Sequence, residues 1–138
     1  MRGTSLSSNM RQLAYACGLF ILGSNIFALP AAAAPENGLT GNWARDDGVV
    51  QMVIAPCGGA LCATNTEVKD PSGEQRVGDR LVLKLTPLSS SVFQGQAYDV
   101  RRQKTYKMTL TVQGTTLHVT GCVLLGIVCK GADWTRIK

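Results

Sequence analysis

The sequence contains eight short segments in which apolar and polar residues alternate, separated by turn-forming residues. The clearest is 104–112, where Tyr106, Met108 and Leu110 share one face and polar residues share the other. Side chains alternate between the two faces of a β-strand, so this period of two predicts strands with one buried face each. The other predicted strands are 42–46, 49–55, 61–68, 80–85, 92–99, 115–122 and 132–137.

Tight turns join most of these segments, as at Asp46-Asp47-Gly48 and Gln113-Gly114, where glycine can take the positive φ that such turns need. Eight strands joined in this way predict an all-β fold: an antiparallel up-and-down meander that closes into a barrel and leaves no free sheet edge. A sandwich of two four-stranded sheets is the alternative, and the lack of long crossovers favours the barrel. The longest polar stretch, 69–79, is predicted to be a loop.

The first 33 residues have the order of a secretory signal peptide: a basic and polar start, an apolar run at Leu13–Leu22 and small residues at Ala31–Ala34. We expect cleavage after Ala33, which leaves 34–138 as one barrel domain. A membrane anchor is the alternative, but a spanning helix needs about 20 apolar residues in a row, and Pro30 is among the residues that interrupt this run. The protein is therefore expected to be periplasmic or secreted, and not integral to the membrane after cleavage.

The expected mature chain carries a mild positive charge. Cleavage removes two of the 14 basic residues and none of the nine acidic ones, which leaves a net charge near +3. This balance does not by itself require nucleic acid or an anionic membrane as partner, and we expect no nucleic acid. The densest basic cluster, Arg101-Arg102-x-Lys104, falls where a solvated hairpin loop is expected.

Four cysteines follow the predicted signal, and Cys17 lies within the signal and is removed with it. An even number of cysteines in a small exported domain indicates disulfides, with three possible pairings. Zinc is the alternative, but the C-x4-C and C-x6-C spacings are not zinc knuckles and the chain has one histidine. Because hairpin loops bring their flanking residues opposite one another, we predict the pairs Cys57–Cys62 and Cys122–Cys129. We expect no metal and no cofactor.

The Gly41-x-Trp43 opening and the late Arg136 resemble the pattern of small lipocalin-like (calycin) barrels. The resemblance implies that Trp43 closes one end of the barrel and that the Arg136 guanidinium stacks on the indole face. It also implies a structural role for Gly41. We expect a structural role for Trp134 too, which lies on the last predicted strand next to Arg136.

A wider pattern resembles the exported bacterial proteins grouped as domain-of-unknown-function family 2147. It covers about residues 39–138 and includes Gly41, Trp43, Pro56-Cys57-Gly58, Cys62, Tyr98-Asp99, Lys104-Thr105-Tyr106, Gly121-Cys122 and Trp134-Thr135-Arg136. The chain departs from it at Ala63, where the family usually has glycine, and in the hairpin after Asp99. The resemblance implies a lipocalin-like barrel outside the cytoplasm and brings no established activity.

Catalytic groups are sparse. The single histidine, His118, is predicted to point outward, and no serine or cysteine forms a recognisable dyad with it. Paired cysteines leave no thiol nucleophile, and the adjacent Asp46 and Asp47 are typical turn formers. We therefore expect that the protein is not an enzyme.

Two functions remain open. The leading hypothesis is that the barrel interior binds a small apolar ligand or an envelope lipid. Gly95 and Ala97 leave space on their strand, which is either a cavity or packing room for neighbouring groups. The tentative ligand-binding residues are Trp43, Met52, Phe93, Ala97, Tyr98, Tyr106 and Met108. The alternative is a protein-interaction module such as a protease inhibitor or an envelope structural protein. Either Tyr98 or Asp99 lines the barrel mouth and hydrogen-bonds a ligand, or Asp99 accepts backbone N–H groups of its own turn. The apolar Val123–Val128 either plugs the barrel or forms an exposed lip.

Overall fold

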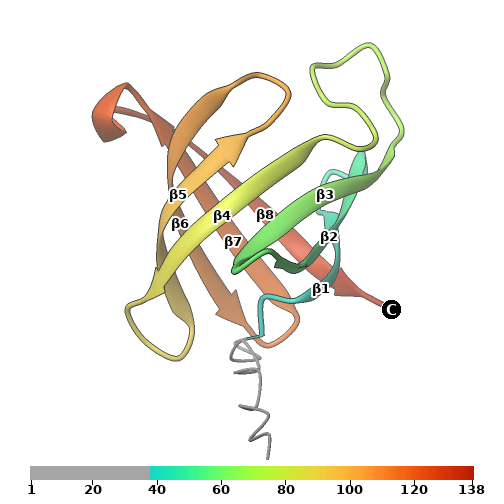
Figure 1. Ribbon diagram of the computed structural model, residues 1–138. Helices are drawn as coiled ribbons and strands as arrows, with labels where there is room; N and C mark the ends of the chain where they lie inside the picture. Colours follow the sequence, from blue (N-terminus) through green and yellow to red (C-terminus); the bar gives the residue numbers. More distant parts are fainter. Residues whose placement is uncertain (1–37) are drawn as a thin grey trace, which may run out of the picture. The chain divides into compact units, whose positions relative to one another are not determined.

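The computed structural model describes residues 38–138, so the predicted signal peptide and its cleavage after Ala33 lie outside the described residues. The described chain forms eight strands in a closed antiparallel barrel, each paired with the next and the last paired with the first (Figure 1). The strands are β1 (Gly41–Arg45), β2 (Val50–Cys57), β3 (Ala60–Val68), β4 (Arg80–Pro87), β5 (Val92–Asp99), β6 (Lys104–Gln113), β7 (Thr116–Val123) and β8 (Val128–Ile137). One 3₁₀ turn, η1 (Leu124–Gly126), joins β7 to β8. The predicted up-and-down barrel is confirmed, and the sandwich is excluded.

Alternating side chains fill the barrel. On β2, Val50, Met52 and Ile54 are buried while the residues between them are half-buried, as the period of two requires. The buried apolar core is Leu39, Trp43, Val50, Met52, Ile54, Ala63, Leu83, Phe93, Ala97, Met108, Leu110, Leu117 and Trp134. These residues come from every strand, so the core is one continuous cluster.

Two strand boundaries differ from the predictions. The sequence predicts that Pro56 ends its strand, yet Pro56 continues β2 and lies opposite Leu61 on β3. Its missing N–H costs little because β1 pairs with β2 only as far as Ile54, so Pro56 has no partner on that side. At the other end of the chain, β8 begins at Val128 rather than at residue 132. The β7–β8 hairpin is therefore longer than predicted.

Gly95 does not leave interior space, contrary to the prediction. A Cβ at Gly95 would lie well inside van der Waals contact of the Lys84 carbonyl oxygen and 3.0 Å from the Leu85 Cα. The backbone of β4 therefore occupies the volume that the absent side chain leaves. The neighbouring Ala97 is fully buried, so β5 is closely packed at both small residues.

We expect Gly95→Ala to lower the free energy of unfolding by about 2–3 kcal/mol, in the upper part of the range for overpacking, because backbone rather than a mobile side chain blocks the new methyl group. Gly131→Ala is the matched control, since a Cβ there would meet only ordinary contacts, the nearest at 3.6 Å from His118. Urea unfolding measures both variants. Equal midpoints for the two variants would mean that β4 does not crowd Gly95.

Candidate functional site

The predicted interior residues divide into two groups. Trp43, Met52, Phe93, Ala97 and Met108 are buried in the core, and Tyr106 is half-buried against it. Most of the tentative ligand-binding residues therefore pack against one another inside the barrel.

Tyr98 does not face the interior. Its side chain is 41% exposed, whereas the neighbouring Ala97 and Asp99 are buried. Successive residues of a strand point to opposite faces, so burying Ala97 and Asp99 places Tyr98 on the outer surface. Tyr98 therefore does not face the ligand-binding interior of the leading hypothesis, and its predicted role at the barrel mouth stays a prediction.

One end of the barrel is closed by Trp43 and Arg136. Trp43 is fully buried, and its indole N–H donates to the Leu39 carbonyl oxygen at 2.9 Å. The Arg136 guanidinium carbon lies 4.2 Å from the centre of the Trp43 ring, and the guanidinium donates to the carbonyl oxygens of Thr40 and Gly38. The structure thus shows the stacked Trp–Arg pair that the lipocalin-like pattern implies.

Gly41 is explained by this same pair. Its φ is +134°, and a Cβ there would collide with Nη1 of Arg136. The guanidinium of Arg136 therefore lies in the space that a side chain at this position would occupy, and the positive φ itself favours glycine. The glycine of the Gly-x-Trp pattern thus suits both the backbone conformation at position 41 and the close approach of Arg136.

Trp134, the other aromatic residue of the predicted pattern, is 8% exposed and pairs with Arg45 of β1 across the closing seam of the barrel. Its indole nitrogen is buried and has no hydrogen-bond partner among the described residues. A buried donor without an acceptor costs about 1–3 kcal/mol. The indole N–H of Trp134 is therefore a polar group in the core that no described protein atom satisfies.

Both predicted disulfides are present. Cys122 and Cys129 lie directly opposite each other on β7 and β8, with Cα atoms 4.0 Å apart. Cys57 and Cys62 are also bonded, with Cα atoms 5.7 Å apart, but they are diagonal rather than opposite. The reason is that the turn contains only Gly58 and Gly59, both with positive φ, instead of the predicted four-residue loop.

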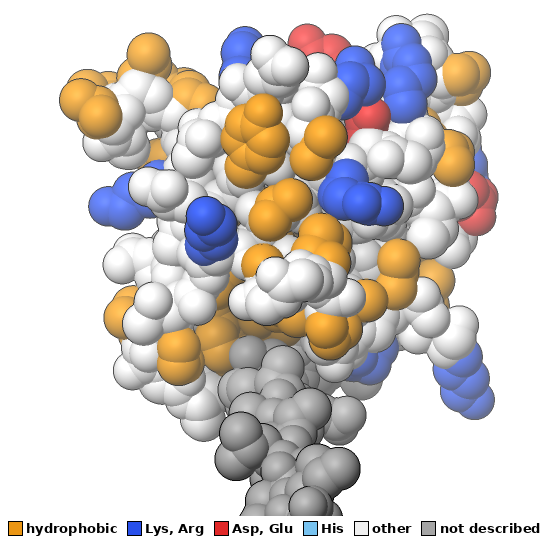
Figure 2. Space-filling view, viewed as in Figure 1, with side chains coloured by type: hydrophobic (Ala, Val, Ile, Leu, Met, Phe, Trp, Pro, Cys, Tyr) orange, Lys and Arg blue, Asp and Glu red, His pale blue; other side chains and the backbone are white. Residues whose placement is uncertain are grey.

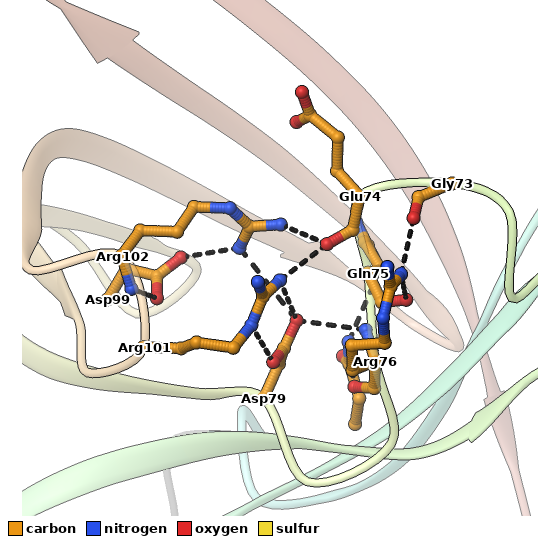
Figure 3. Close-up of polar contacts among 9 residues, drawn as sticks. Gly73, Glu74, Gln75, Arg76, Asp79, Asp99, Arg101 and Arg102 are labelled. Atoms are coloured by element: carbon orange, nitrogen blue, oxygen red, sulfur yellow. Dashed lines mark hydrogen bonds and ion pairs between the residues drawn. The ribbon is translucent and has the colours of Figure 1, made fainter.

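The Arg101-Arg102 pair is not a free solvated cluster, contrary to the prediction (Figure 3). Arg102 donates from Nη1 to Asp99 Oδ2 at 2.7 Å and from its backbone nitrogen to Asp99 Oδ1 at 2.9 Å. Arg101 pairs with Asp79 at the end of the 69–79 loop, and both guanidinium groups donate to the Glu74 carbonyl oxygen. Asp99 is 2% exposed, so it belongs to its own turn, and the two arginines tie the β5–β6 turn to the 69–79 loop.

The hydrogen bond from Arg101, together with that from the Arg76 backbone and the nearby positive charges, lowers the pKa of Asp79 below its ordinary value. A lowered folded-state pKa stabilises the protein at pH values above the unfolded pKa, which is about 4. This contribution is lost as the pH falls through the folded pKa of Asp79. The loop attachment is therefore complete at neutral pH and weakens only in acid.

An open groove of about 640 Å³ lies on the outer surface of the barrel. Its floor consists of outward side chains of three adjacent strands, and its wall is the end of the β7–β8 hairpin. The residues of the groove are Thr86, Leu88, Gln94, Gly95, Gln96, Thr105, Lys107 and Cys122–Gly126. Lys107 is the one charged side chain among them.

The register explains how this groove forms. Lys84, Gln96 and Lys107 lie side by side on β4, β5 and β6, and Lys107 is paired in turn with Cys122. The row therefore runs across the outer face to the Cys122–Cys129 disulfide. A Cβ added at Gly126 would lie 3.8 Å from Cδ of Lys107, so the hairpin end extends over this face of the sheet.

The apolar segment that closes this hairpin is exposed. We define the tip as residues 124–128; its four large apolar side chains, Leu124, Leu125, Ile127 and Val128, are between 46% and 103% exposed. Figure 1 shows the hairpin end projecting from the upper left of the barrel, and Figure 2 shows apolar atoms gathered there with Lys or Arg side chains below them. Of the two possibilities left open by the sequence, the segment is a lip and not a plug.

A small surface cluster surrounds the single histidine. His118 is on the outer face, as predicted, and its Nδ1 lies 2.5 Å from Asp133 Oδ1. Thr120 Oγ1 lies 3.4 Å from the other ring nitrogen. The side chains of His118 and Asp133 are each 52% exposed, so the cluster lacks the water-excluded setting on which acyl transfer depends. That the protein is not an enzyme stays a prediction.

Two further searches concern only residues 38–138. Within them, no three histidine, cysteine, aspartate or glutamate side chains gather closely enough to hold a metal ion. No helix in this part of the chain has the length and apolar character needed to span a membrane.

Comparison with known proteins places the chain in a family. No curated protein matches it. A solved structure described as a redesigned β-barrel matches with 15% sequence identity and a TM-score of 0.47, over 72% of this chain and 91% of that one. The model of the uncharacterised proteins conserved in bacteria, DUF2147, matches residues 41–136. The chain, with its glycine, tryptophan and arginine at the barrel seam, therefore belongs to this bacterial family.

Proposed function

We propose that this protein is an exported barrel that binds an amphipathic lipid with a single acyl chain in the outer groove. The observation that carries the proposal is the groove itself, with an apolar wall at Val123–Leu125 and a basic side chain, Lys107, at its floor. Its volume of about 640 Å³ is within the roughly 300–1,000 Å³ common for small-molecule sites.

The two sides of the groove suit the two parts of such a ligand. The exposed leucines of the wall can cover an acyl chain, which removes apolar surface of both partners from water. The ammonium group of Lys107 can pair with an anionic head group, and Gln94 and Gln96 can donate hydrogen bonds to its oxygens. A fatty acid or a lysophospholipid has this combination of groups.

The proposal moves the ligand from the interior to the outer surface. The interior volume expected at Gly95 is taken by the β4 backbone, and Ala97, Phe93 and Met108 are buried in the core. A long acyl chain would therefore need the core to repack, which costs free energy in a closely packed interior. The groove needs no such rearrangement.

Export is supported by the two disulfides. Such bonds persist in oxidising compartments such as the periplasm and are rare in the cytosol. The exported location also matches the signal-like N-terminal sequence. An intact mass that corresponds to loss of about the first 33 residues would establish the cleavage.

The test is calorimetric titration of the exported protein with dodecanoate and with lysophosphatidylglycerol, both below their micelle-forming concentrations. We expect saturable binding, and we expect Gln96→Trp to weaken it at least tenfold, because the indole would occupy the centre of the groove floor. Thr66→Trp, at an exposed position of β3, is the matched control and should bind as the unmodified protein does.

Two results would contradict the proposal. Binding that is equally tight in Gln96→Trp and in Thr66→Trp would place the ligand away from the groove. Absence of saturable binding by either amphiphile would favour a protein partner, which is the alternative function.

A further inference from the structure

The geometry points to the β7–β8 tip as a membrane-docking element: we infer that it inserts into the surface of an anionic lipid bilayer. The inference rests on the proposed function only for the lipid that the groove beside the tip would bind. The observations that support membrane docking are independent of that function. Three observations carry it: the exposure of the apolar side chains, the backbone that presents them, and the charges around them.

The exposure is unusual in extent and in place. Leu124 is 69% exposed, Leu125 is 103% exposed and Ile127 is 81% exposed. Three large apolar side chains within four residues contribute almost nothing to the core. Single exposed apolar residues are ordinary on protein surfaces, but a contiguous exposed group indicates an interaction site.

The backbone holds these side chains outward at a cost. Leu124 and Leu125 have φ values of 51° and 58°, in the left-handed region that non-glycine residues rarely adopt. The Cys122–Cys129 disulfide closes the hairpin directly beneath the tip, so it limits the conformations through which the strain could relax. Strained backbone that persists in a native fold is common where a segment serves binding.

The charges beside the tip are positive. Lys107 is paired with Cys122 on the face of the groove, and Lys84 lies further along the same row on β4. Lys130 follows Cys129 on β8 and is exposed on the other face of that strand, opposite Gly121. The groove beneath the tip is lined by no acidic side chain among the described residues. Lysines that flank inserted apolar residues are attracted to the phosphates of anionic lipids.

The size of the tip favours a bilayer over a protein partner. A stable protein interface buries about 800 Å² on each partner, whereas the apolar group here is a narrow projection of one hairpin end. Interfacial insertion needs only a few apolar side chains and nearby positive charge. Docking in this way would bring the groove, whose wall includes Leu124 and Leu125, to the lipid surface.

The experiment is sedimentation of the exported protein with vesicles of phosphatidylcholine alone and of equal parts phosphatidylcholine and phosphatidylglycerol. We expect binding to the anionic vesicles that weakens as salt is raised, and much weaker binding to the neutral ones. Leu125→Asp should lower the vesicle partition coefficient by about tenfold to a hundredfold, as expected when one leucine side chain no longer becomes buried in the bilayer. Lys107→Glu with Lys130→Glu should weaken it by a similar factor.

Two control variants isolate the tip. Val77→Asp makes the same chemical change at a side chain that is 64% exposed in the 69–79 loop, and Lys138→Glu reverses a charge at the opposite end of β8. Both should bind vesicles as the unmodified protein does. Because Leu125 is fully exposed, Leu125→Asp should also unfold at the same urea concentration as the unmodified protein.

Vesicle binding by Leu125→Asp equal to that of Val77→Asp would overturn the inference, as would the absence of binding to anionic vesicles. The inference would also fail if the protein binds no vesicles but forms a dimer in analytical ultracentrifugation that Leu125→Asp abolishes. The tip would then serve self-association. Failure of docking with intact lysolipid binding would leave the groove proposal standing. Vesicle binding without lysolipid binding would reject the groove proposal alone.

Discussion

Replacing Trp43 with alanine is expected to lower the free energy of unfolding by about 3–5 kcal/mol, the usual cost of removing a buried tryptophan. Trp43 is fully buried, so its removal leaves a cavity that the surrounding strands cannot fill. It also removes the hydrogen bond to Leu39 and the surface on which Arg136 stacks. Urea or thermal unfolding of the purified protein measures the loss.

Arg136→Lys separates the stack from the cavity. Lysine keeps the positive charge but has no planar group to lie over the indole, and it cannot reproduce the forked bonds to Thr40 and Gly38. We expect a smaller loss than for Trp43→Ala, and one that is larger than for Lys138→Arg at an exposed position. A Trp43→Ala variant as stable as the unmodified protein would contradict the role of Trp43 in closing the barrel.

Arg102→Ala is expected to cost about 3 kcal/mol, because removing one partner of a buried ion pair leaves the other charge uncompensated. The side chain of Asp99 is 3% exposed, and that of Arg102 is 25% exposed, which places the expected loss at the lower end for buried pairs. Arg101→Ala is the neighbouring control. Its contacts are more exposed, so a markedly smaller loss is expected.

A second substitution distinguishes the buried charge from a general disturbance of the loop. Asp99→Asn in the Arg102→Ala background removes the uncompensated carboxylate. The asparagine side-chain oxygen can still accept the hydrogen bond from the backbone nitrogen of residue 102. The double variant should therefore be more stable than Arg102→Ala alone. If it is less stable, the loss does not come from an unpaired Asp99.

Much of the barrel follows from local sequence. The alternation in strands such as β2 and β6 depends only on which face of a strand is buried, and the pairing of Cys122 with Cys129 depends on a single hairpin. Trp43 and Arg136 lie far apart in sequence, so no local pattern predicts their contact. Only the resemblance to lipocalin-like barrels predicts it.

Other features depend on contacts that no local pattern contains. The volume at Gly95 is decided by the path of β4, and a glycine in a sequence looks the same whether space or backbone adjoins it. The anchoring of Arg101 and Arg102 depends on a loop more than 20 residues earlier in the chain. The groove forms because the β7–β8 hairpin extends over the outer face of the sheet. The sequence does not predict that β8 begins at Val128, because Val128–Lys130 does not alternate clearly between apolar and polar residues.

We propose that an amphipathic lipid binds outside the barrel, against the tip, and not within the core. Backbone amide NMR of the purified protein during titration with lysophosphatidylglycerol distinguishes these two places. We predict that chemical-shift changes concentrate at residues 94–96, 105–107 and 122–127. Changes concentrated at Trp43, Phe93 and Met108, with the tip unaffected, would show an interior ligand and contradict binding in the outer groove.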